Sequence, residues 1–248
     1  MVASNNAIYN TVGASISGVT NTLTVTNPSN TASSAARETI VVGGGTAGDP
    51  TLNWNVSGVT NWEMGIDNSV SDNLTISQGT SLGTNDVWRM NTSGSRIMPL
   101  QPLAFARLSA PVVNATGDGT NYTILFDDVS INPQSAYNPA TGIFTAPVTG
   151  NYMVMTQVSY NGLTAAHTGA NIIIATTGRN FLCPMYNPFA IRTLSTVNQE
   201  MGASCMVRLT AGDTIFIIIS IQNGAKVITV NGSGVTNEYC QVQFALLC

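Results

Sequence analysis

The stretch Phe126–Tyr152, which reads FDDVSINPQSAYNPATGIFTAPVTGNY, decides the fold of this chain. Its large aromatic residues stand in short runs that turn-forming residues separate. Gly142 and Gly150 bracket the run Phe144–Pro147, for example, and glycine is a residue that tight turns favour. Short apolar runs between turns are typical of β-strands, whereas a helix needs a longer periodic pattern. The stretch therefore predicts a series of short strands.

The residues that follow continue the β pattern. Asn151–Tyr160 alternates large and polar side chains, as a strand with one face in water does. Three Asn-Gly pairs favour hairpin turns, because both residues accept a positive φ, and they stand at Asn161-Gly162, Asn223-Gly224 and Asn231-Gly232. The best helix candidate, Ala32–Glu38, is too short to be stable alone. We expect an all-β chain.

The spacing in this part of the chain resembles the signature of the complement C1q and tumour-necrosis-factor-like superfamily. Asn132 follows Phe126 after five intervening residues, and Tyr152 follows Gly150 after one. The resemblance covers about residues 101–248. The positions that carry it are Phe126, Asn132, Tyr137, Phe144, Gly150, Tyr152, Gly212 and Asp213.

The resemblance continues downstream, with departures. Leu-Thr-Ala-Gly-Asp at 209–213 resembles the family's tight turn into its long inner strand, and Phe-Ala-Leu-Leu at 244–247 resembles its terminal strand. The family usually has aromatic residues where Val154 and Thr156 stand, and a glycine where Ala245 stands. These departures weaken the expected aromatic layer but keep the strand pattern.

The resemblance implies a jelly-roll β-sandwich that forms a homotrimer and binds a ligand without catalysing a reaction. The run Asp213–Ile221 fits an oligomer, because nearly every residue in it is apolar. A strand with one wet face would alternate, so we expect this strand to be covered on both faces, one of them by another chain. The alternative is a central strand that a loop of the same chain covers. The residues expected in the oligomer core are Ile215, Phe216, Ile217 and Ile219.

Residues 1–98 form a separate region, and residues 99–248 form the head. The boundary lies in the proline-containing segment Ile97–Phe105, because proline pins the backbone. Residues 1–98 hold few large apolar side chains, so we expect this β-rich region to act as a shaft, collar or assembly segment of an oligomer. Gly43–Gly94 resembles shaft segments of phage and bacterial trimeric fibres. The expected strands are Thr22–Thr26, Thr51–Val56, Asn73–Ser77 and Asp86–Met90.

The composition excludes some partners. Charged residues make up 8% of the 248 residues, the net charge is −4, and Lys226 is the one lysine. Nucleic-acid binding needs clustered Lys or Arg, and the sequence has no such cluster. No apolar run approaches the roughly 20 residues that span a bilayer, so we expect no membrane insertion. Weak charge repulsion also permits close self-association.

Few residues suggest chemistry. His167 is the one histidine, and no G-x-S-x-G nucleophile motif accompanies it. Asp127 and Asp128 are candidate calcium ligands, but neighbouring residues of a strand point to opposite faces. We expect no cofactor, with calcium as the alternative. The four cysteines allow three disulfide pairings or none, and they are Cys183, Cys205, Cys240 and Cys248.

The segment 178–202 is the candidate receptor surface. Aromatic residues and arginine are enriched at interface anchors, and loops on a rigid sandwich often bind partners. The residues expected to contact a receptor are Arg179, Tyr186, Asn187 and Arg192. Core or trimer contacts are the alternative role for the aromatic residues of this segment. Candidate glycosylation sites, each an Asn-x-Ser/Thr sequon, are Asn55, Asn73, Asn91, Asn114, Asn121 and Asn231.

The sequence as a whole favours a non-enzymatic trimeric fibre tip or adhesin that binds a cell-surface glycan or protein receptor. We expect it outside the cell, on a virion or a cell-surface appendage, and the absence of a secretory signal at the N-terminus favours a phage fibre. The alternative is a structural subunit of an extracellular filament that assembles through its N-terminal region. A glycan hydrolase ranks last, because the few acidic residues show no pairing.

Overall fold

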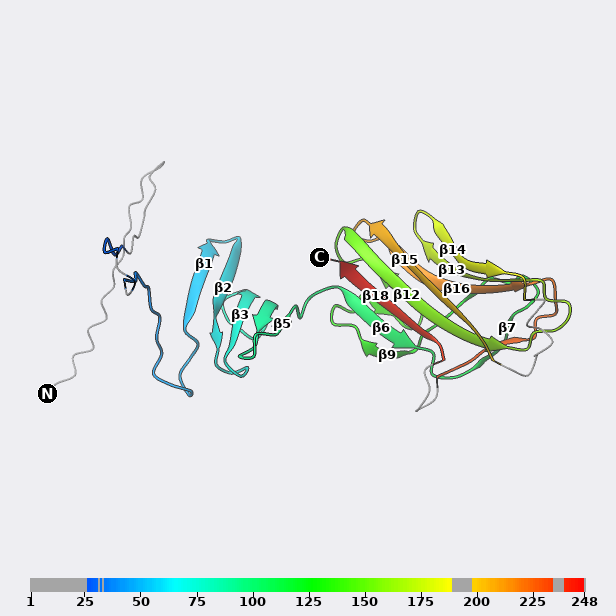
Figure 1. Cartoon of the computed structure of the whole chain (residues 1–248), viewed down its shortest axis with the longest axis horizontal. Helices are drawn as coiled ribbons and strands as arrows, with labels where there is room; N and C mark the ends of the chain where they lie inside the picture. The colour runs from blue at the N-terminus through cyan, green and yellow to red at the C-terminus, as the bar shows by residue number, and fades with distance from the viewer. Residues whose placement is uncertain (1–25, 31, 33, 189–197, 234–238, 248) are drawn as a thin grey trace.

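The computed structural model describes residues 26–30, 32, 34–188, 198–233 and 239–247. These residues contain no α-helix and form eighteen strands in three sheets, which confirms the predicted all-β class. An N-terminal sheet comes first along the chain, and a two-sheet sandwich follows it (Figure 1). Residues 98–102 join the two units and carry no strand.

The N-terminal sheet is an antiparallel meander, in which each strand pairs with the next one along the chain. Its strands are β1 (Thr51–Val56), β2 (Thr60–Asp67), β3 (Asn73–Gln78), β4 (Asp86–Met90) and β5 (Arg96–Ile97). The sequence predicted β1, β3 and β4 within a residue of their bounds but missed β2. The expected strand Thr22–Thr26 lies, apart from its last residue, outside the described residues.

The head consists of two antiparallel sheets that face each other (Figure 1). The β12 sheet has the order β7 (Val112–Thr116), β17 (Ile228–Val230), β12 (Gly150–Asn161), β18 (Gln241–Leu247), β6 (Leu103–Arg107) and β9 (Asp128–Ile131), and β15 (Gln199–Leu209) also pairs with β12. The β16 sheet has the order β10 (Tyr137–Asn138), β11 (Ile143–Thr145), β16 (Thr214–Gln222), β13 (Gly169–Thr176) and β14 (Asn180–Tyr186), and β8 (Tyr122–Thr123) also pairs with β16.

An aromatic stack joins the two sheets at one end of the core. The ring of Phe244 stacks on Phe144 at 4.7 Å and on Tyr137 at 5.8 Å, and Phe144 meets Tyr152 edge-on at 5.7 Å. All four side chains are buried. Aromatic pairs in such arrangements contribute about 0.5–1.5 kcal/mol each beyond their buried area. Three of the four residues are signature positions, so the stack explains their spacing.

Hydrogen bonds fix the other signature residues. Asn132 and the backbone of Tyr137 bond reciprocally, at 2.8 and 3.2 Å. The Tyr137 hydroxyl accepts the backbone N–H of Phe126 at 3.1 Å. Gly212 adopts a φ of 92° in the turn between β15 and β16, where the Asp213 carboxylate accepts the backbone N–H of Thr210 at 2.8 Å. The signature therefore encodes the core and its turns.

The structure corrects the expected role of β16. Ile215, Ile217 and Ile219 are buried inside a single chain, between the two sheets. They are core residues of one head and are not exposed for contact with another chain. Phe216 points to the opposite face, where it is half-buried, and Ser220 on the same face is buried within the chain. The inner face of this strand is thus covered by its own chain. Phe216 and Ile218 on the outer face stay partly exposed, so the contact of that face with another chain stays a prediction.

Candidate oligomer and receptor interfaces

The outer face of the β12 sheet carries apolar side chains that its own chain leaves open. Along β12, Tyr152, Val154 and Val158 point into the core, so the alternate positions Met153 and Met155 point outward. On the neighbouring strand β15, Met206 also points outward. Met155 is 44% exposed and Met206 is 63% exposed. The outward positions of these strands, where polar residues are expected in a strand with one face in water, therefore carry methionine.

Strand register places these side chains in rows across the sheet. Met153 lies opposite Met206 on β15 and opposite Ala245 on β18. Met155 lies opposite Ser204 and Gln243 in the next row. That row continues through Phe105 on β6 to Ile131 on β9, which is 47% exposed. These outward positions are collectively called the methionine face.

Charged groups on the methionine face lie toward its ends. Arg208 extends outward near one end of β15, and Glu200 near the other, where it accepts a hydrogen bond from Gln157 at 3.1 Å. Arg107 and Asp128 form an ion pair at 2.7 Å on β6 and β9. A hollow of about 400 Å³ lies beside Met155 and Gln157, between the two ends. The centre of the face is therefore apolar or amide-bearing, as the centre of a protein interface is.

The two candidate calcium ligands each contact protein groups. Asp127 accepts the backbone N–H and the hydroxyl of Ser109, at 2.7 and 2.5 Å, and these bonds lower the pKa of Asp127 although its partial burial raises it. Asp128 pairs with Arg107. The two carboxylates thus point to different partners, and the described residues place no group of three or more His, Cys, Asp or Glu side chains around one point.

His167 is part of the packing of the head. Its side chain is buried, and its Nδ1 accepts the backbone N–H of Thr164 at 2.8 Å. A backbone N–H can only donate, so Nε2 carries the proton that it donates to the Ala225 carbonyl at 3.1 Å. The residue links two loops, and the Thr164 hydroxyl also lies 3.0 Å from its Nδ1. Its described hydrogen-bond partners include no acidic side chain that could orient the ring.

Comparison with known proteins fixes the family. A model of the C1q domain matches residues 109–234, which is half of the chain. The chain belongs to the C1q domain family. A complement C1q subcomponent of Mus musculus is 27% identical to it over 113 residues, which are 46% of this chain and 40% of that protein. The chain thus matches less than half the length of this curated relative.

Solved structures of C1q-like and tumour-necrosis-factor-like domains also match the C1q head. The globular domain of zebrafish complement 1qA matches with a TM-score of 0.37 and 15% identity, over 58% of this chain and 93% of that chain. Murine APRIL at pH 5.0 matches with a TM-score of 0.40 and 14% identity, over 59% of this chain and 99% of that chain. Eiger TNF from S. frugiperda matches with a TM-score of 0.40 and 13% identity, over 60% of this chain and 93% of that chain.

The expected receptor residues of the C1q head do not form one compact site. Arg179 is exposed in the turn before β14, where its backbone N–H bonds to the hydroxyl of Thr176 at 3.2 Å. Asn187 is exposed just beyond the other end of β14, next to Tyr186, the last residue of that strand. A seven-residue strand spans roughly 20 Å, which separates the two ends. Arg192 lies outside the described residues.

Burial divides the six sequons. Asn55, Asn114 and Asn121 are exposed and Asn91 is half-buried, so these four amides remain candidates. Asn73 and Asn231 are buried, at 7% and 8% exposure. The Asn231 amide donates to Ser159 at 2.9 Å and accepts from Asn161 at 2.8 Å. Glycan transfer needs an accessible side-chain nitrogen, and these two amides are inaccessible in the folded chain.

The cysteines lie in different surroundings. Cys240 is fully buried and is a free thiol, whose sulfur lies 3.2 Å from the backbone nitrogen of Ser159. Cys205 is half-buried on β15, Cys183 belongs to β14, and Cys248 lies outside the described residues. Cys240 therefore belongs to the core of the head.

Sequence reasoning missed the methionine face. It treated Asn151–Tyr160 as a strand with a wet face without asking which residues that face holds. The signal was present, since Met153 and Met155 alternate with core residues on that strand. No helix of the described part is long and apolar enough to cross a membrane.

Proposed function

We propose that the chain forms a homotrimer through the methionine face and binds a cell-surface receptor with the outward parts of its heads. The single observation that carries the proposal is the exposed apolar centre of the methionine face, on a sandwich whose core is already filled by its own chain. Burial of such a surface stabilises an oligomer in proportion to the apolar area removed from water. Domains of the C1q and tumour-necrosis-factor-like type are generally trimers that bind receptors or other ligands, and this supports the proposal.

The proposal places the receptor surface on the other sheet. If the methionine faces meet at the trimer axis, then β14, the edge strand of the β16 sheet, lies away from them. Arg179 would then be solvent-accessible, and its guanidinium can donate to the carboxylates or hydroxyls of a glycan or protein. The ends of β14 would act as separate contacts within one broad surface.

The proposed setting is a fibre tip or adhesin outside the cell, on a virion or a surface appendage. The low charge of the chain and the β-rich region before the head support it. The N-terminal region would join the head to the rest of a fibre. No catalytic role is proposed, because family members of this type bind ligands without enzymatic activity.

Light scattering of the full chain tests the trimer. Met206→Glu introduces a charge on the methionine face at a position that is 63% exposed, so the single chain can still fold. Val113→Glu is the matched control, because Val113 is 69% exposed but lies on β7, outside the rows described above. We expect three chains per particle for the wild type and the control, and smaller particles for Met206→Glu. A monomeric wild type would overturn the proposal.

Binding to intact cells and to glycan arrays tests the receptor surface. Arg179→Ala should weaken binding several-fold without a change of mass. Lys226→Ala is the control, because it removes one exposed positive charge elsewhere on the head. Equal binding by the wild type and Arg179→Ala would move the receptor site away from this end of β14.

A further inference from the structure

We infer that the N-terminal sheet packs its apolar face against the same face of the other two chains, and so forms a second, dry trimer core next to the heads. The inference rests on the proposed trimer and goes beyond it, because three heads can form a trimer while their three N-terminal sheets stay apart from one another. It begins from an inversion in the sheet: its polar side chains are buried within the chain, and its apolar side chains are exposed.

One face of the N-terminal sheet is apolar on four successive strands. The register places Leu52, Met64, Ile76 and Trp88 side by side across β1 to β4. Strand alternation adds the neighbouring outward positions on the same face. They are Trp54, Val56, Trp62, Ile66, Leu74 and Met90.

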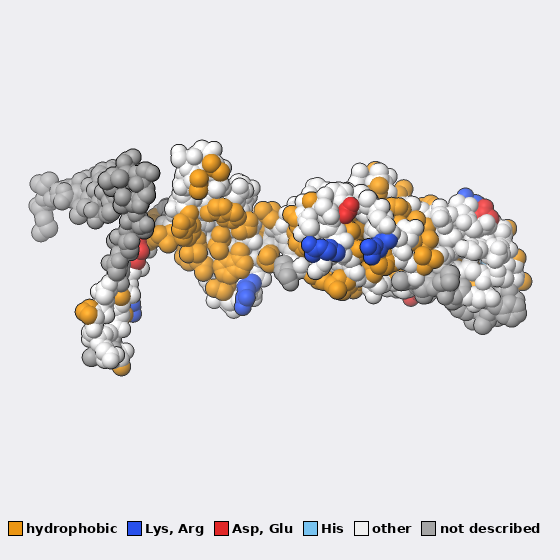
Figure 2. Space-filling view, turned by 90° about the horizontal axis from the view of Figure 1, so that it is seen from above, with side chains coloured by type: hydrophobic (Ala, Val, Ile, Leu, Met, Phe, Trp, Pro, Cys, Tyr) orange, Lys and Arg blue, Asp and Glu red, His pale blue; other side chains and the backbone are white. Residues whose placement is uncertain are grey.

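This surface, called the tryptophan face below, is open to solvent in the single chain. Trp54 is 52% exposed, Val56 58%, and Leu52 39%. Hydrophobic side chains gather visibly over the N-terminal unit in Figure 2. All three tryptophans of the chain lie on this face. Among β1 to β4 it carries no charged side chain, and Arg96 on β5 lies at its edge.

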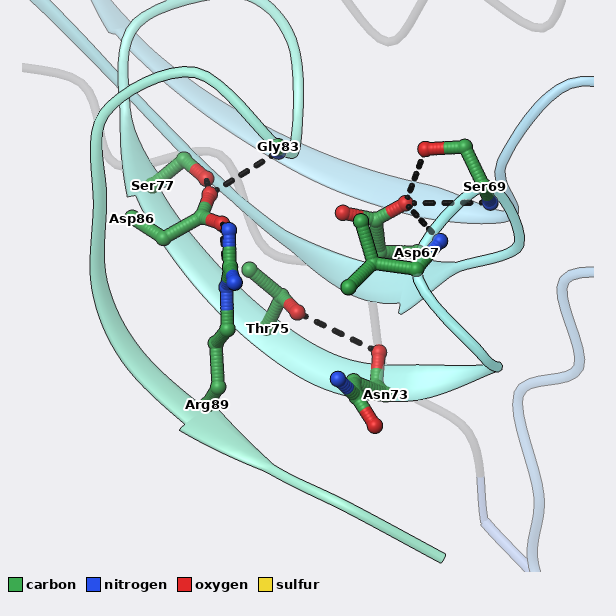
Figure 3. A network of polar contacts seen from close by, with 9 residues as sticks. Asp67, Ser69, Asn73, Thr75, Ser77, Gly83, Asp86 and Arg89 are labelled. Atoms are coloured by element: carbon green, nitrogen blue, oxygen red, sulfur yellow. Dashed lines mark hydrogen bonds and ion pairs between the residues drawn. The ribbon is translucent and has the colours of Figure 1, made fainter. Parts of the chain in front are cut away.

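The opposite face is largely closed over β2, β3 and β4, whereas Asn53 and Asn55 on β1 are exposed. The loop between β3 and β4 folds over it, and the backbone N–H of Gly83 donates to Asp86 at 2.9 Å. Asp86 also binds Ser77 and Arg89, so its carboxylate is saturated by protein groups (Figure 3). Thr75 and Asp67, further along this face, are fully buried (Figure 3). The apolar surface that the sheet leaves open is therefore the tryptophan face.

A single sheet with these properties is a poor fold by itself. Sheets become stable when a second layer covers their apolar face. Here the buried face holds Glu63, Asp67 and Asn73, each with an oxygen that accepts no hydrogen bond from the described residues. Unpaired buried polar atoms cost free energy, so apolar burial must come from elsewhere. The tryptophan face is the surface that can supply it.

The short linker to the head favours the other two chains of the trimer as the partners that cover the tryptophan face. β5 ends at Ile97 and β6 begins at Leu103, and part of this segment is bound to the head. The Gln101 side chain donates to the Leu246 carbonyl at 2.7 Å, and the Pro102 carbonyl accepts the Leu246 N–H at 2.9 Å. Six Cα–Cα steps reach at most about 20 Å. Three heads that meet would therefore hold three tryptophan faces close together, at effective concentrations on the order of millimolar.

The size of the face explains why the linker matters. Four strands about 4.8 Å apart, each about 20 Å long, give a face of roughly 400 Å². Three such faces give about 400 Å² for each pair of chains, which is less than separate proteins need for a stable interface, so association of the faces relies on the trimer of heads. The lack of charge on the face also removes the repulsion that identical charged faces would have.

Tryptophan fluorescence of the full chain tests the inference, because the tryptophans report on this face and not on the head. In the wild-type trimer we expect blue-shifted emission and weak quenching by acrylamide. Ile76→Glu puts a charge at the centre of the face and should raise the quenching constant several-fold while the heads remain trimeric. Asn53→Glu is the matched control, because Asn53 is exposed on the opposite face of β1.

The outcomes separate this inference from the proposed function. A wild-type trimer whose tryptophans are freely quenched would overturn the inference and leave the trimer of heads intact. A wild-type monomer would overturn both. Long polymers that Ile76→Glu dissolves into trimers would also overturn it, because the tryptophan faces would then join one trimer to the next in a filament.

Discussion

At the scale of single residues, close contacts between loops determine how the far end of the head is built. His167 bridges Thr164 and Ala225, and two glycines pack against its ring. A Cβ at Gly224 would lie 2.4 Å from the imidazole, and a Cβ at Gly117 would lie 2.1 Å from the Ala225 carbonyl oxygen. The histidine is thus enclosed on several sides, so it cannot move aside for a larger neighbour.

Gly224→Ala should therefore destabilise the head by about 1–3 kcal/mol, the usual cost of overpacking a tight site. Urea unfolding followed by far-UV circular dichroism measures the change. Gly178→Ala is the control, because no atom lies within 4 Å of a Cβ at that position. A shift of equal size in both variants would mean that the contact with His167 is not the cause.

The buried thiol of Cys240 makes a pH-dependent contribution. Burial raises the pKa of Cys240 to about 12, because the thiolate would lose its hydration. The unfolded thiol ionises near 9, so the contribution is complete below pH 9 and is lost as the pH rises toward 12. We expect a loss of stability over that interval that is smaller in Cys240→Ala, after allowance for the buried tyrosines. Mass-spectrometric mapping should also find Cys240 unalkylated at pH 8 until the chain unfolds.

At the scale of elements, the N-terminal sheet depends on a carboxylate on its closed face. Burial alone would raise the pKa of Asp86, but hydrogen bonds from Ser77, Arg89 and Gly83 lower it below its ordinary value. A carboxyl group of this kind stabilises the folded state above the unfolded pKa, near 3.8. Its contribution is lost as the pH falls through the lowered folded value. The sheet is therefore expected to be acid-sensitive.

Asp86→Asn should reduce that acid sensitivity and also weaken the sheet at neutral pH, where removal of a buried charged partner costs roughly 1–3 kcal/mol. Tryptophan fluorescence in urea at pH 7 and near pH 3 measures both effects, since the tryptophans belong to this sheet. Asp72→Asn serves as the control, because Asp72 is exposed. An unchanged difference between the two pH values in Asp86→Asn would show that other groups cause it.

The same elements show how far the sequence leads. The signature from Phe126 to Tyr152 predicted the head correctly, because aromatic spacing and turn glycines are local patterns. The long apolar run was misassigned at Ile215, Ile217 and Ile219, because these side chains are buried between the two sheets of one chain. The inversion of the N-terminal sheet was not predictable from residue counts. It depends on a loop that covers the polar side chains around Asp86, which is a tertiary property.

At the scale of the whole molecule, the two units are coupled by a short linker, and its length is a testable variable. If the tryptophan faces are held together by the trimer of heads, then the stability of the N-terminal sheet depends on the effective concentration that the linker sets. Part of the linker is bound to the head through Gln101 and Pro102, so the free span is shorter than residues 98–102. An insertion between Met98 and Pro99 would lengthen it directly.

An insertion of about 20 Gly/Ser residues lengthens the free span by about three doublings, and loop-closure entropy then costs about 2 kcal/mol per chain. The tryptophan transition in urea should move to lower concentration, while the circular dichroism transition of the head stays in place. An insertion of the same composition and length in the exposed turn at Gly178 is the control, because it adds flexible chain without separating the two units. A tryptophan transition at the same urea concentration in the linker variant and the wild type would mean that the tryptophan face is covered without help from the heads. Such a cover would be either tight association of the three sheets by themselves or an occupant from outside the trimer.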